Sequence, residues 1–247
     1  MLYANQLLRK NVDTYLSLDQ TRNDRRFDMP FRVTFDEGRD FVDERHKSLV
    51  EGKTHAETHM IDIGIPGWLL PADAGKLYEL ATYSVGPILE IGTFKGLSTS
   101  ILAEAVANSG RPRRIITVDL NPGNIAEAAI GMGERKTSGR QNVHFYVNEG
   151  GAFVRFAAQQ KMTFGFAFID HSHQFDHVVS VIQGLPKILA PGAFVLFHDY
   201  NDPRNPHEDN KNFGVYQAVE QAGVASHLDF RGIFGCCGLF RYMPKQD

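Results

Sequence analysis

Pro-Ile-Leu-Glu-Ile-Gly-Thr-Phe-Lys-Gly-Leu-Ser, residues 87–98, is the stretch that decides the fold. The apolar run 87–91 has the length and composition of a buried β-strand. Two glycines then lead into an apolar helical pattern over 98–108, for which Ser98 is the predicted N-cap. Outward from this unit, apolar runs alternate with helical patterns. The further predicted strands are 114–118, 143–147, 163–169 and 193–197, and the further predicted helices are 124–136, 152–160 and 175–189.

Strands that are apolar on both faces and alternate with helices predict a parallel sheet covered on both sides. Beyond Asp199, a polar loop and a predicted helix over 214–221 precede two β-like runs, 227–234 and 237–242. Gly235 joins these two runs, so we expect an antiparallel hairpin that closes the sheet. The predicted fold class is therefore α/β with a Rossmann-like, mostly parallel sheet.

The N-terminal part differs from the rest in charge. About a third of residues 1–60 are charged, against under a fifth of the remainder. The sparse apolar positions of 36–50 predict a solvated helix that cannot form a core of its own. A helix with proline in its first turn is predicted over 71–81. We therefore expect an N-terminal helical cap or arm over 1–70 and one main domain over 71–247. Such an arm could exchange between the subunits of a homo-oligomer.

Composition excludes several classes of protein. The chain has 247 residues and a formal net charge of −3, so it lacks the basic excess that would make nucleic acid its main partner. No window reaches the length of a membrane helix and the N-terminus has no secretory pattern, so we expect a cytoplasmic protein that does not bind membranes. The only cysteines, Cys236 and Cys237, are adjacent and apolar in context, which predicts buried, reduced thiols.

The glycine turn after the first strand is the first candidate binding element. Glycine at 92 and 96 lets backbone N–H groups approach a ligand, and the following helix end favours negative charge. A tight strand-to-helix turn without a ligand is the alternative explanation. Phe94 stands where the dinucleotide motif G-x-G-x-x-G has its second glycine, which disfavours a nicotinamide enzyme.

Polar residues also end the following strands, where ligands of open parallel sheets bind. Asp119 could accept both hydroxyls of a ribose, or could be an ordinary surface aspartate. Asn-Glu-Gly-Gly at 148–151 is small and polar, as expected beside an adenine edge. Asp170 and Asp199 follow strongly apolar strands, and a carboxylate there is costly to bury without a partner. This pairing indicates a functional site.

These residues resemble a class I S-adenosylmethionine-dependent methyltransferase of the catechol and caffeoyl-CoA O-methyltransferase type, including bacterial small-molecule O-methyltransferases. The resemblance covers roughly residues 70–247 and implies a seven-stranded sheet with an antiparallel C-terminal strand. It implies S-adenosylmethionine as cofactor, with the methionine part beside the glycine turn and the ribose at Asp119. The residues expected to bind the cofactor are Glu90, Gly92, Thr93, Gly96, Ser98, Asp119, Glu149, Gly150, Asp170 and His171.

The resemblance also implies a divalent cation, usually Mg²⁺, held by Asp170 and Asp199, which would bind two oxygens of a vicinal diol. A hard cation lowers the pKa of a bound hydroxyl and makes it a better nucleophile. His198 or Asn201 could complete the metal site, although imidazole favours softer metals than Mg²⁺. His173 stands where related enzymes carry a catalytic lysine, so it is a candidate base, unless it only lines the pocket. Asp170 and His198 are the other candidate catalytic residues.

The predicted function is methyl transfer from S-adenosylmethionine to an oxygen of a small hydroxylated acceptor. The alternatives are a metal-independent O- or N-methyltransferase on the same fold, or a non-catalytic cofactor-binding protein. A zinc hydrolase using His173 and His177 is disfavoured, because no glutamate adjoins His173 and no cysteine is near in sequence. Specificity would come from residues 1–70 and 200–213, where Phe31 and Trp68 could be either core or substrate wall.

Overall fold

The computed structural model describes residues 60–202, 204, 205 and 212–244. The predicted N-terminal arm up to residue 59, the helix over 36–50 and Phe31 lie outside the described residues. Residues 60–70 form turns and extended chain that lead directly into the first described helix.

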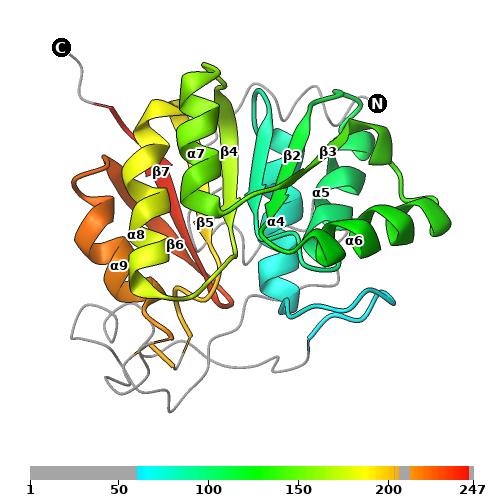
Figure 1. The fold of residues 1–247 in the computed structure, drawn as a ribbon, viewed down its shortest axis with the longest axis horizontal. Helices are drawn as coiled ribbons and strands as arrows, with labels where there is room; N and C mark the ends of the chain where they lie inside the picture. The colour runs from blue at the N-terminus through cyan, green and yellow to red at the C-terminus, as the bar shows by residue number, and fades with distance from the viewer. Residues whose placement is uncertain (1–59, 203, 206–211, 245–247) are drawn as a thin grey trace.

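A seven-stranded sheet forms the centre of the molecule, in the order β3-β2-β1-β4-β5-β7-β6 (Figure 1). Strands β1 to β5 pair in parallel, and β7 runs antiparallel to both β5 and β6. The predicted Rossmann-like sheet with an antiparallel C-terminal strand is confirmed. The strands are β1 Ile88–Ile91, β2 Ile115–Asp119, β3 Val143–Val147, β4 Phe164–Ile169, β5 Leu189–Phe197, β6 Leu228–Phe234 and β7 Cys237–Tyr242.

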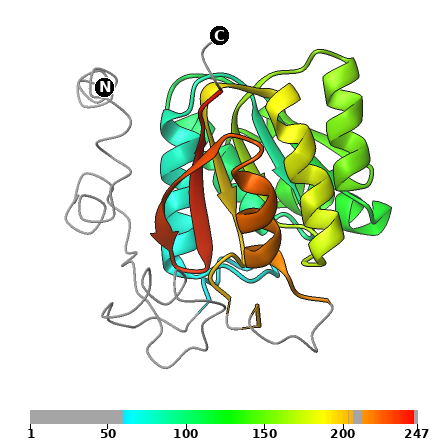
Figure 2. The same ribbon diagram turned by 90° about the vertical axis from the view of Figure 1, so that its left-hand side faces the viewer.

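Helices cover both faces of the sheet, as Figures 1 and 2 show. The apolar residues of α4, α5 and α6 form one core cluster against the sheet, and those of α7, α8 and α9 form a second cluster on the other face. Both strands β1 and β4 are buried along their whole length, which explains why β4 is apolar at every position and β1 at every position except Glu90. The helices are α4 Pro71–Tyr83, α5 Leu97–Asn108, α6 Pro122–Glu134, α7 Gly150–Gln159, α8 Phe175–Gly184 and α9 Val215–Gly223, with short 3₁₀ turns η2 Arg140–Asn142 and η3 Leu185–Lys187.

Several predicted boundaries differ from the observed ones, and three of the differences have a clear physical reason. Helix α5 begins at Leu97 and its N-cap is Gly96, in the left-handed conformation with φ of 87°, so Ser98 is not the cap. The backbone must reverse sharply between β1 and α5, and glycine enters that conformation without a steric cost. The helix predicted over 175–189 ends at Gly184 and gives way to η3, because Pro186 lacks the N–H that a continuing helix would need. Strand β5 therefore begins at Leu189 and not at residue 193.

No helix among the described residues is long and apolar enough to cross a membrane. The carboxyl ends of β1 to β5 all reach the same edge of the sheet, because these strands are parallel and in register. The loops that follow them converge at this edge, which is the position where open α/β sheets bind ligands.

Candidate active site

A cavity of about 720 Å³ opens at the carboxyl ends of the parallel strands. Residues from the end of every parallel strand line it, together with residues 67–70 before α4 and the turn between β6 and β7. Glu90, Gly96 and Asn201 do not line it, although the sequence singled them out. The sequence-derived candidates that do line it are Gly92, Thr93, Ser98, Asp119, Glu149, Gly150, Asp170, His171, His173, His198 and Asp199.

The glycine turn keeps its shape without the second glycine of the dinucleotide motif. Gly92 has φ of 110°, and a side chain there would overlap the carbonyl group of Asp170 in the neighbouring loop. Phe94 also adopts a left-handed conformation, with φ of 43°. A bulky residue rarely adopts this conformation unless its surroundings hold it. The backbone N–H of Phe94 donates to Asp119 Oδ2 at 2.8 Å, which supplies that constraint.

Gly96 has a structural part in this turn. A Cβ atom at this position would lie 3.0 Å from the Cβ of Ala128, so Gly96 lets α6 pack closely against the start of α5. Its left-handed conformation also starts α5. The structure thus places Gly96 against a helix, and not beside the cavity where a cofactor would lie.

Glu90 lies beneath the glycine turn and is completely buried. Its Oε2 accepts hydrogen bonds from the hydroxyls of Thr99 and Thr117, both at 2.6 Å, and the Thr117 hydroxyl also contacts that of Thr93 at 2.5 Å. Burial raises the pKa of Glu90 to about 7, although hydrogen bonds from Ser98, Thr117 and Thr99 act in the opposite direction. Glu90 therefore holds Ser98 by a direct hydrogen bond and Thr93 through the hydroxyl of Thr117.

Asp119 and Glu149 accept hydrogen bonds from backbone N–H groups of the loops around the cavity. Asp119 accepts from Phe94 N and from Asn121 N, both at 2.8 Å. Glu149 is the N-cap of α7 and accepts from the N–H groups of residues 151 and 152. Partial burial raises the pKa of Glu149, but these backbone hydrogen bonds outweigh it, and the pKa lies below its ordinary value. Both acids therefore shape the rim of the cavity.

Two histidines and two aspartates meet where β4 and β5 end. His198 Nδ1 lies 3.3 Å from Asp170 Oδ1 and 3.1 Å from Asp199 Oδ2, and His173 Nε2 lies 2.9 Å from Asp199 Oδ2. Burial lowers the pKa of His198, but Asp170 and Asp199 outweigh it and hold that pKa well above its ordinary value. Burial raises the pKa of Asp199, whereas His198 and His173 hold it well below its usual range. The sequence-derived acids and bases thus form one charge cluster.

The backbone of Asp199 is itself unusual, with φ of 58° in a residue that is not glycine. Asn205 holds this turn, because its side-chain amide donates to the carbonyls of Asp199, Tyr200 and Asp202. The turn orients the Asp199 carboxylate toward both histidines. Strain of this kind is often found at functional sites.

Asn201 does not join the charge cluster. Its side-chain amide donates to Gly235 O at 3.3 Å, and its backbone N–H donates to Cys236 O at 3.0 Å. Asn201 therefore attaches the end of β5 to the turn between β6 and β7.

His171 and His177 have local contacts of their own. His171 packs over Gly150, where a Cβ atom would lie 2.8 Å from the imidazole Cδ2, and burial lowers its pKa. His177 Nδ1 contacts the Ser172 hydroxyl at 2.9 Å. Among the described residues, the potential metal-binding clusters do not include His177, so the structure does not assemble a zinc pair from His173 and His177.

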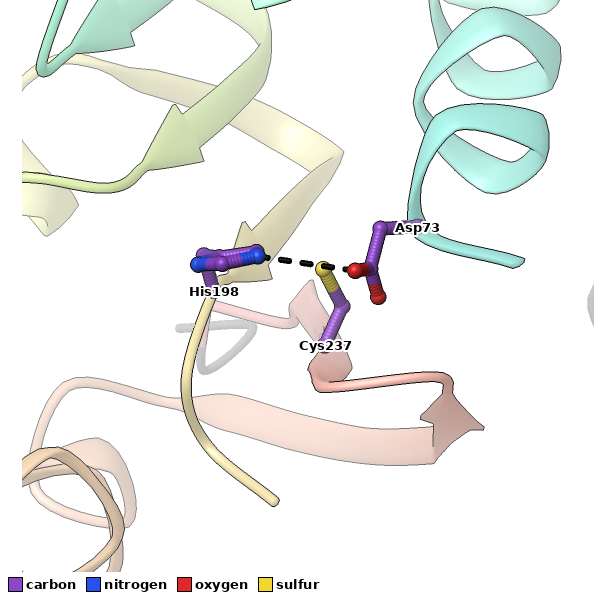
Figure 3. Close-up of side chains that lie close together, drawn as sticks. All are labelled: Asp73, His198 and Cys237. Carbon is purple, nitrogen blue, oxygen red and sulfur yellow. Dashed lines mark ion pairs between the residues drawn. The ribbon is translucent and has the colours of Figure 1, made fainter. Parts of the chain in front are cut away.

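Sequence reasoning missed Asp73 in the first turn of α4. Its carboxylate accepts from Leu70 N at 2.7 Å and from Cys236 N at 2.8 Å, and Oδ2 lies 3.5 Å from His198 Nε2 (Figure 3). An acid after the proline of a helix start is a capping signal. Its contacts with β5 and β7 depend on tertiary packing and carry no local signal.

Arg204 and Asp202 were also missed, in the loop that the sequence left uninterpreted. The guanidinium of Arg204 binds Asp202 at 2.8 and 2.9 Å, lies 3.6 Å from Asp199 Oδ1 and stacks 4.0 Å above the ring of Phe213. Phe213 in turn contacts the ring of His173, with centroids 4.7 Å apart. This chain of contacts borders His173 on the open side of the cavity.

Trp68 lies on the wall of the cavity and not in the core. Its ring is 66% exposed and stacks on Phe94, with ring centroids 5.2 Å apart and an interplanar angle of 27°. Of the two interpretations that the sequence allowed, the structure supports the wall.

Both cysteines are buried and form no disulfide with each other or with the other described residues. The prediction of buried thiols is confirmed. Cys236 lines the cavity, whereas Cys237 lies behind it, where burial raises the pKa of its thiol.

Comparisons with known proteins agree with this architecture. Residues 89–200 match the family model described as a methyltransferase domain. The cofactor-bound structure of Rv0187 from MTB superposes with a TM-score of 0.60 at 19% identity, over 74% of this chain and 85% of that one. The O-methyltransferase TomG from Streptomyces achromogenes, in complex with SAM, superposes with a TM-score of 0.57 at 21% identity, over 71% of this chain and 82% of that one. CalS11, a TDP-rhamnose 3′-O-methyltransferase, superposes with a TM-score of 0.54 at 18% identity, over 68% of this chain and 76% of that one. No curated protein sequence matches the chain significantly.

Proposed function

We propose that this chain is an S-adenosylmethionine-dependent methyltransferase that methylates an oxygen of a small hydroxylated acceptor, because residues 89–200 match the methyltransferase-domain family model. The observation that carries this proposal is the cluster of two carboxylates and two imidazoles on one side of the cavity. A hydroxyl is a weak nucleophile until its proton is removed, and these groups can remove it. The O-methyltransferases TomG and CalS11, which share the fold, support the choice of oxygen.

The cofactor would occupy the other side of the cavity. Gly92, Thr93 and Ser98 would surround its methionine part, where the backbone of the glycine turn and the start of α5 come close. Asp119 would accept the ribose hydroxyls, and residues 148–150 would meet the adenine beside the exposed side chain of Leu120. When bound, S-adenosylmethionine supplies an electrophilic methyl group on a positively charged sulfur. His171, beside Gly150, would close this half of the cavity.

His173 is the proposed base. The Asp199 carboxylate lies 2.9 Å from His173 Nε2 and would hold the proton on that nitrogen, which leaves Nδ1 as the basic atom of the ring. His173 would accept the hydroxyl proton of the acceptor as the acceptor oxygen displaced the sulfur from the methyl carbon, with the carbon–sulfur electron pair remaining on sulfur. Asp170 and His198 would orient the acceptor and balance the charge beside it.

Asp170, His173 and Asp199 fit a divalent cation by their donor atoms, since one ligand atom of each lies within 4.8 Å of the others. With His173 acting as the base, the carboxylates of Asp170 and Asp199 would hold Mn²⁺ or Mg²⁺, with water completing the shell. A bound cation would hold the acceptor oxygens and lower the pKa of a hydroxyl. The metal-independent alternative has its own support, because His198 Nδ1 already lies between the two carboxylates.

Two measurements test the proposal. S-adenosylhomocysteine should raise the melting temperature, because a ligand that binds only the folded state stabilises it, whereas NAD should leave it unchanged. A shift with NAD and none with millimolar S-adenosylhomocysteine would overturn the cofactor assignment. Methyl transfer should then be measured across small alcohols, vicinal diols and amines. Methylation confined to amines would overturn the oxygen assignment.

The cation needs a separate test. Activity should be lost in excess chelator and return with Mg²⁺ or Mn²⁺, and Asp170→Asn should weaken this reactivation at least tenfold. Asp176→Asn is the matched control, since Asp176 is exposed on α8 and outside the described donor clusters. Full activity in chelator would leave the metal-independent mechanism.

A further inference from the structure

A second group of donor side chains lies behind the charge cluster. Asp73 comes from the first turn of α4, His198 from the end of β5 and Cys237 from the start of β7 (Figure 3). One ligand atom of each lies within 4.8 Å of the others, and all three residues are buried. Three elements that are distant in sequence thus bring together a carboxylate, an imidazole and a thiol.

The chemistry of this set differs from that of the cation site proposed above. Sulfur and nitrogen donors favour Zn²⁺ and related transition metals, whereas Mg²⁺ and Ca²⁺ favour oxygen donors. Three protein ligands also match a common zinc arrangement, in which a fourth position remains for water or a substrate atom.

The orientation of His198 is the second, independent observation. Nδ1 faces the carboxylates of Asp170 and Asp199, at 3.3 and 3.1 Å, whereas Nε2 faces Asp73 Oδ2 at 3.5 Å. Both ring nitrogens are buried and neither makes a hydrogen bond within the part of the chain that the structure describes, so the carboxylates near Nδ1 leave Nε2 open to another partner. Metal-binding histidines commonly direct their other ring nitrogen at a carboxylate, which fixes the lone pair on the nitrogen that binds the metal. His198 has this arrangement.

A metal ion could reach this position from the cavity. Asp73, His198 and Cys236 all line the cavity wall, and Cys237 follows Cys236 directly. An imidazolium paired with Asp73 would also satisfy Nε2, but that pair would give the thiol of Cys237 no part. The two explanations therefore differ in whether sulfur binds a metal.

We propose that Asp73, His198 Nε2 and Cys237 Sγ form a zinc-type metal site behind the methyl-transfer cavity. The ion joins α4 to the ends of β5 and β7 and fixes the ring that faces Asp170 and Asp199. This site is separate from the cation proposed at Asp170 and Asp199, and it does not depend on the methyltransferase activity of the chain.

Cobalt binding to the reduced, full-length, metal-free protein tests the proposal. Co²⁺ bound to a thiolate gives a near-ultraviolet sulfur-to-metal charge-transfer band. We expect this band at one equivalent of Co²⁺ in the wild type, and we expect added Zn²⁺ to abolish it by displacement. Absence of the band from the wild type, or its persistence with excess Zn²⁺, would overturn the proposal without reference to any variant.

Cys237→Ser and Cys236→Ser are a matched pair of adjacent, buried cysteines. Cys237→Ser should abolish the band, and Cys236→Ser should retain it. The reverse result would assign the sulfur ligand to the neighbouring cluster of Asp199, Asp202 and Cys236 and overturn the proposal. If Cys237→Ser does not fold, Asp73→Asn is the variant that tests the site. It should weaken Co²⁺ binding at least tenfold, and an unchanged affinity for Co²⁺ would overturn the proposal.

Asp170→Asn separates this site from the proposed function. It should keep the sulfur-to-cobalt band, with affinity lowered about 10–100-fold at most through His198, even where methyl transfer is lost. Binding of S-adenosylhomocysteine, measured by calorimetry on the same samples, reports on the cofactor site alone. These measurements therefore distinguish failure of the proposed metal site from failure of the proposed methyltransferase function.

Discussion

The two halves of the cavity use their acidic residues in opposite ways. At the ends of β1, β2 and β3, Asp119 and Glu149 accept hydrogen bonds from backbone N–H groups of the loops that follow these strands. At the ends of β4 and β5, Asp170 and Asp199 contact the imidazoles of His173 and His198. The first half is a backbone cradle, and the second half is a cluster of ionisable side chains.

The difference in hydrogen-bond partners suits the two halves of the cavity to different tasks, ligand binding in the first and proton transfer in the second. A backbone cradle binds a ligand by shape and fixed dipoles and needs no change in protonation. A cluster of carboxylates and imidazoles can accept or release a proton, and its charge depends on pH and on bound ions. We therefore expect changes in the first half to affect folding and cofactor binding, and changes in the second half to affect the rate of the chemical step.

The largest effect should come from Gly92→Ala in the cradle. The added Cβ would overlap the Asp170 carbonyl, and alanine is strained at a φ of 110°, so stability should fall by roughly 3–5 kcal/mol. Gly64→Ala is the matched control, because Gly64 also has positive φ, at 72°, but has no neighbour within 4 Å of an added Cβ. It should lose only about 1 kcal/mol. Urea denaturation measures both, and equal losses would contradict the close approach.

His173→Ala should give the largest effect in the charge cluster, on rate and not on folding. Removing a general base lowers kcat by about 10²–10⁴-fold, while the binding of S-adenosylhomocysteine should be unchanged. His177→Ala, which also removes an imidazole from the cavity wall, should stay within a few-fold of the wild type. A near-normal kcat with an unaltered pH–rate profile would exclude His173 as the base.

Glu90 tests whether the cradle is independent of pH. Its pKa is about 7 in the folded protein and 4.5 in the unfolded chain, so the folded state binds the proton more tightly. The resulting stabilisation is fully present below pH 4.5 and is lost as the pH rises through 7. Glu90→Gln does not titrate, so its stability relative to the wild type should increase by about 3 kcal/mol between pH 4.5 and 8.

Urea denaturation at several pH values measures this difference, with Glu104→Gln as the matched control. Glu104 is exposed on the same helix that contacts Glu90, so its substitution should show no such trend. A constant difference between wild type and Glu90→Gln across this range would show that Glu90 stays ionised in the fold.

The cradle is also the half that the sequence predicted better. Strand ends, the glycine turn and Asp119 are local features, because each follows an apolar run whose period sets its place in the sheet. Even there, the sequence assigned Gly96 to the cofactor, although it packs against Ala128 of α6. The sequence alone does not distinguish a glycine that lets two helices pack closely from a glycine that lets a ligand approach the backbone.

The charge cluster was predicted in its members but not in its contacts. Asp170, His173, His198 and Asp199 stand beside strand ends in the sequence, and the structure brings them together. Asp73 could not be found this way, because its contact with His198 exists only after α4 packs against β5 and β7. The hydrogen bond from Asn201 to the distant Gly235 could not be found from the sequence for the same reason.

Trp68 lines the cavity beside the glycine turn, and its substitution should give the smallest effect. Its ring stacks on Phe94 of the glycine turn but is 66% exposed, so Trp68→Ala should leave stability nearly unchanged. We expect the exposed part of the ring to stack on the bound ligand, so loss of this contact, worth about 0.5–1.5 kcal/mol, should weaken S-adenosylhomocysteine binding by about 2–10-fold, and Trp68→Phe should largely restore it. Because Trp68 is the only tryptophan of the chain, quenching of its fluorescence should report binding directly in the wild type. An unchanged affinity for S-adenosylhomocysteine combined with a lower kcat in Trp68→Ala would instead indicate that this ring contacts the acceptor and not the cofactor.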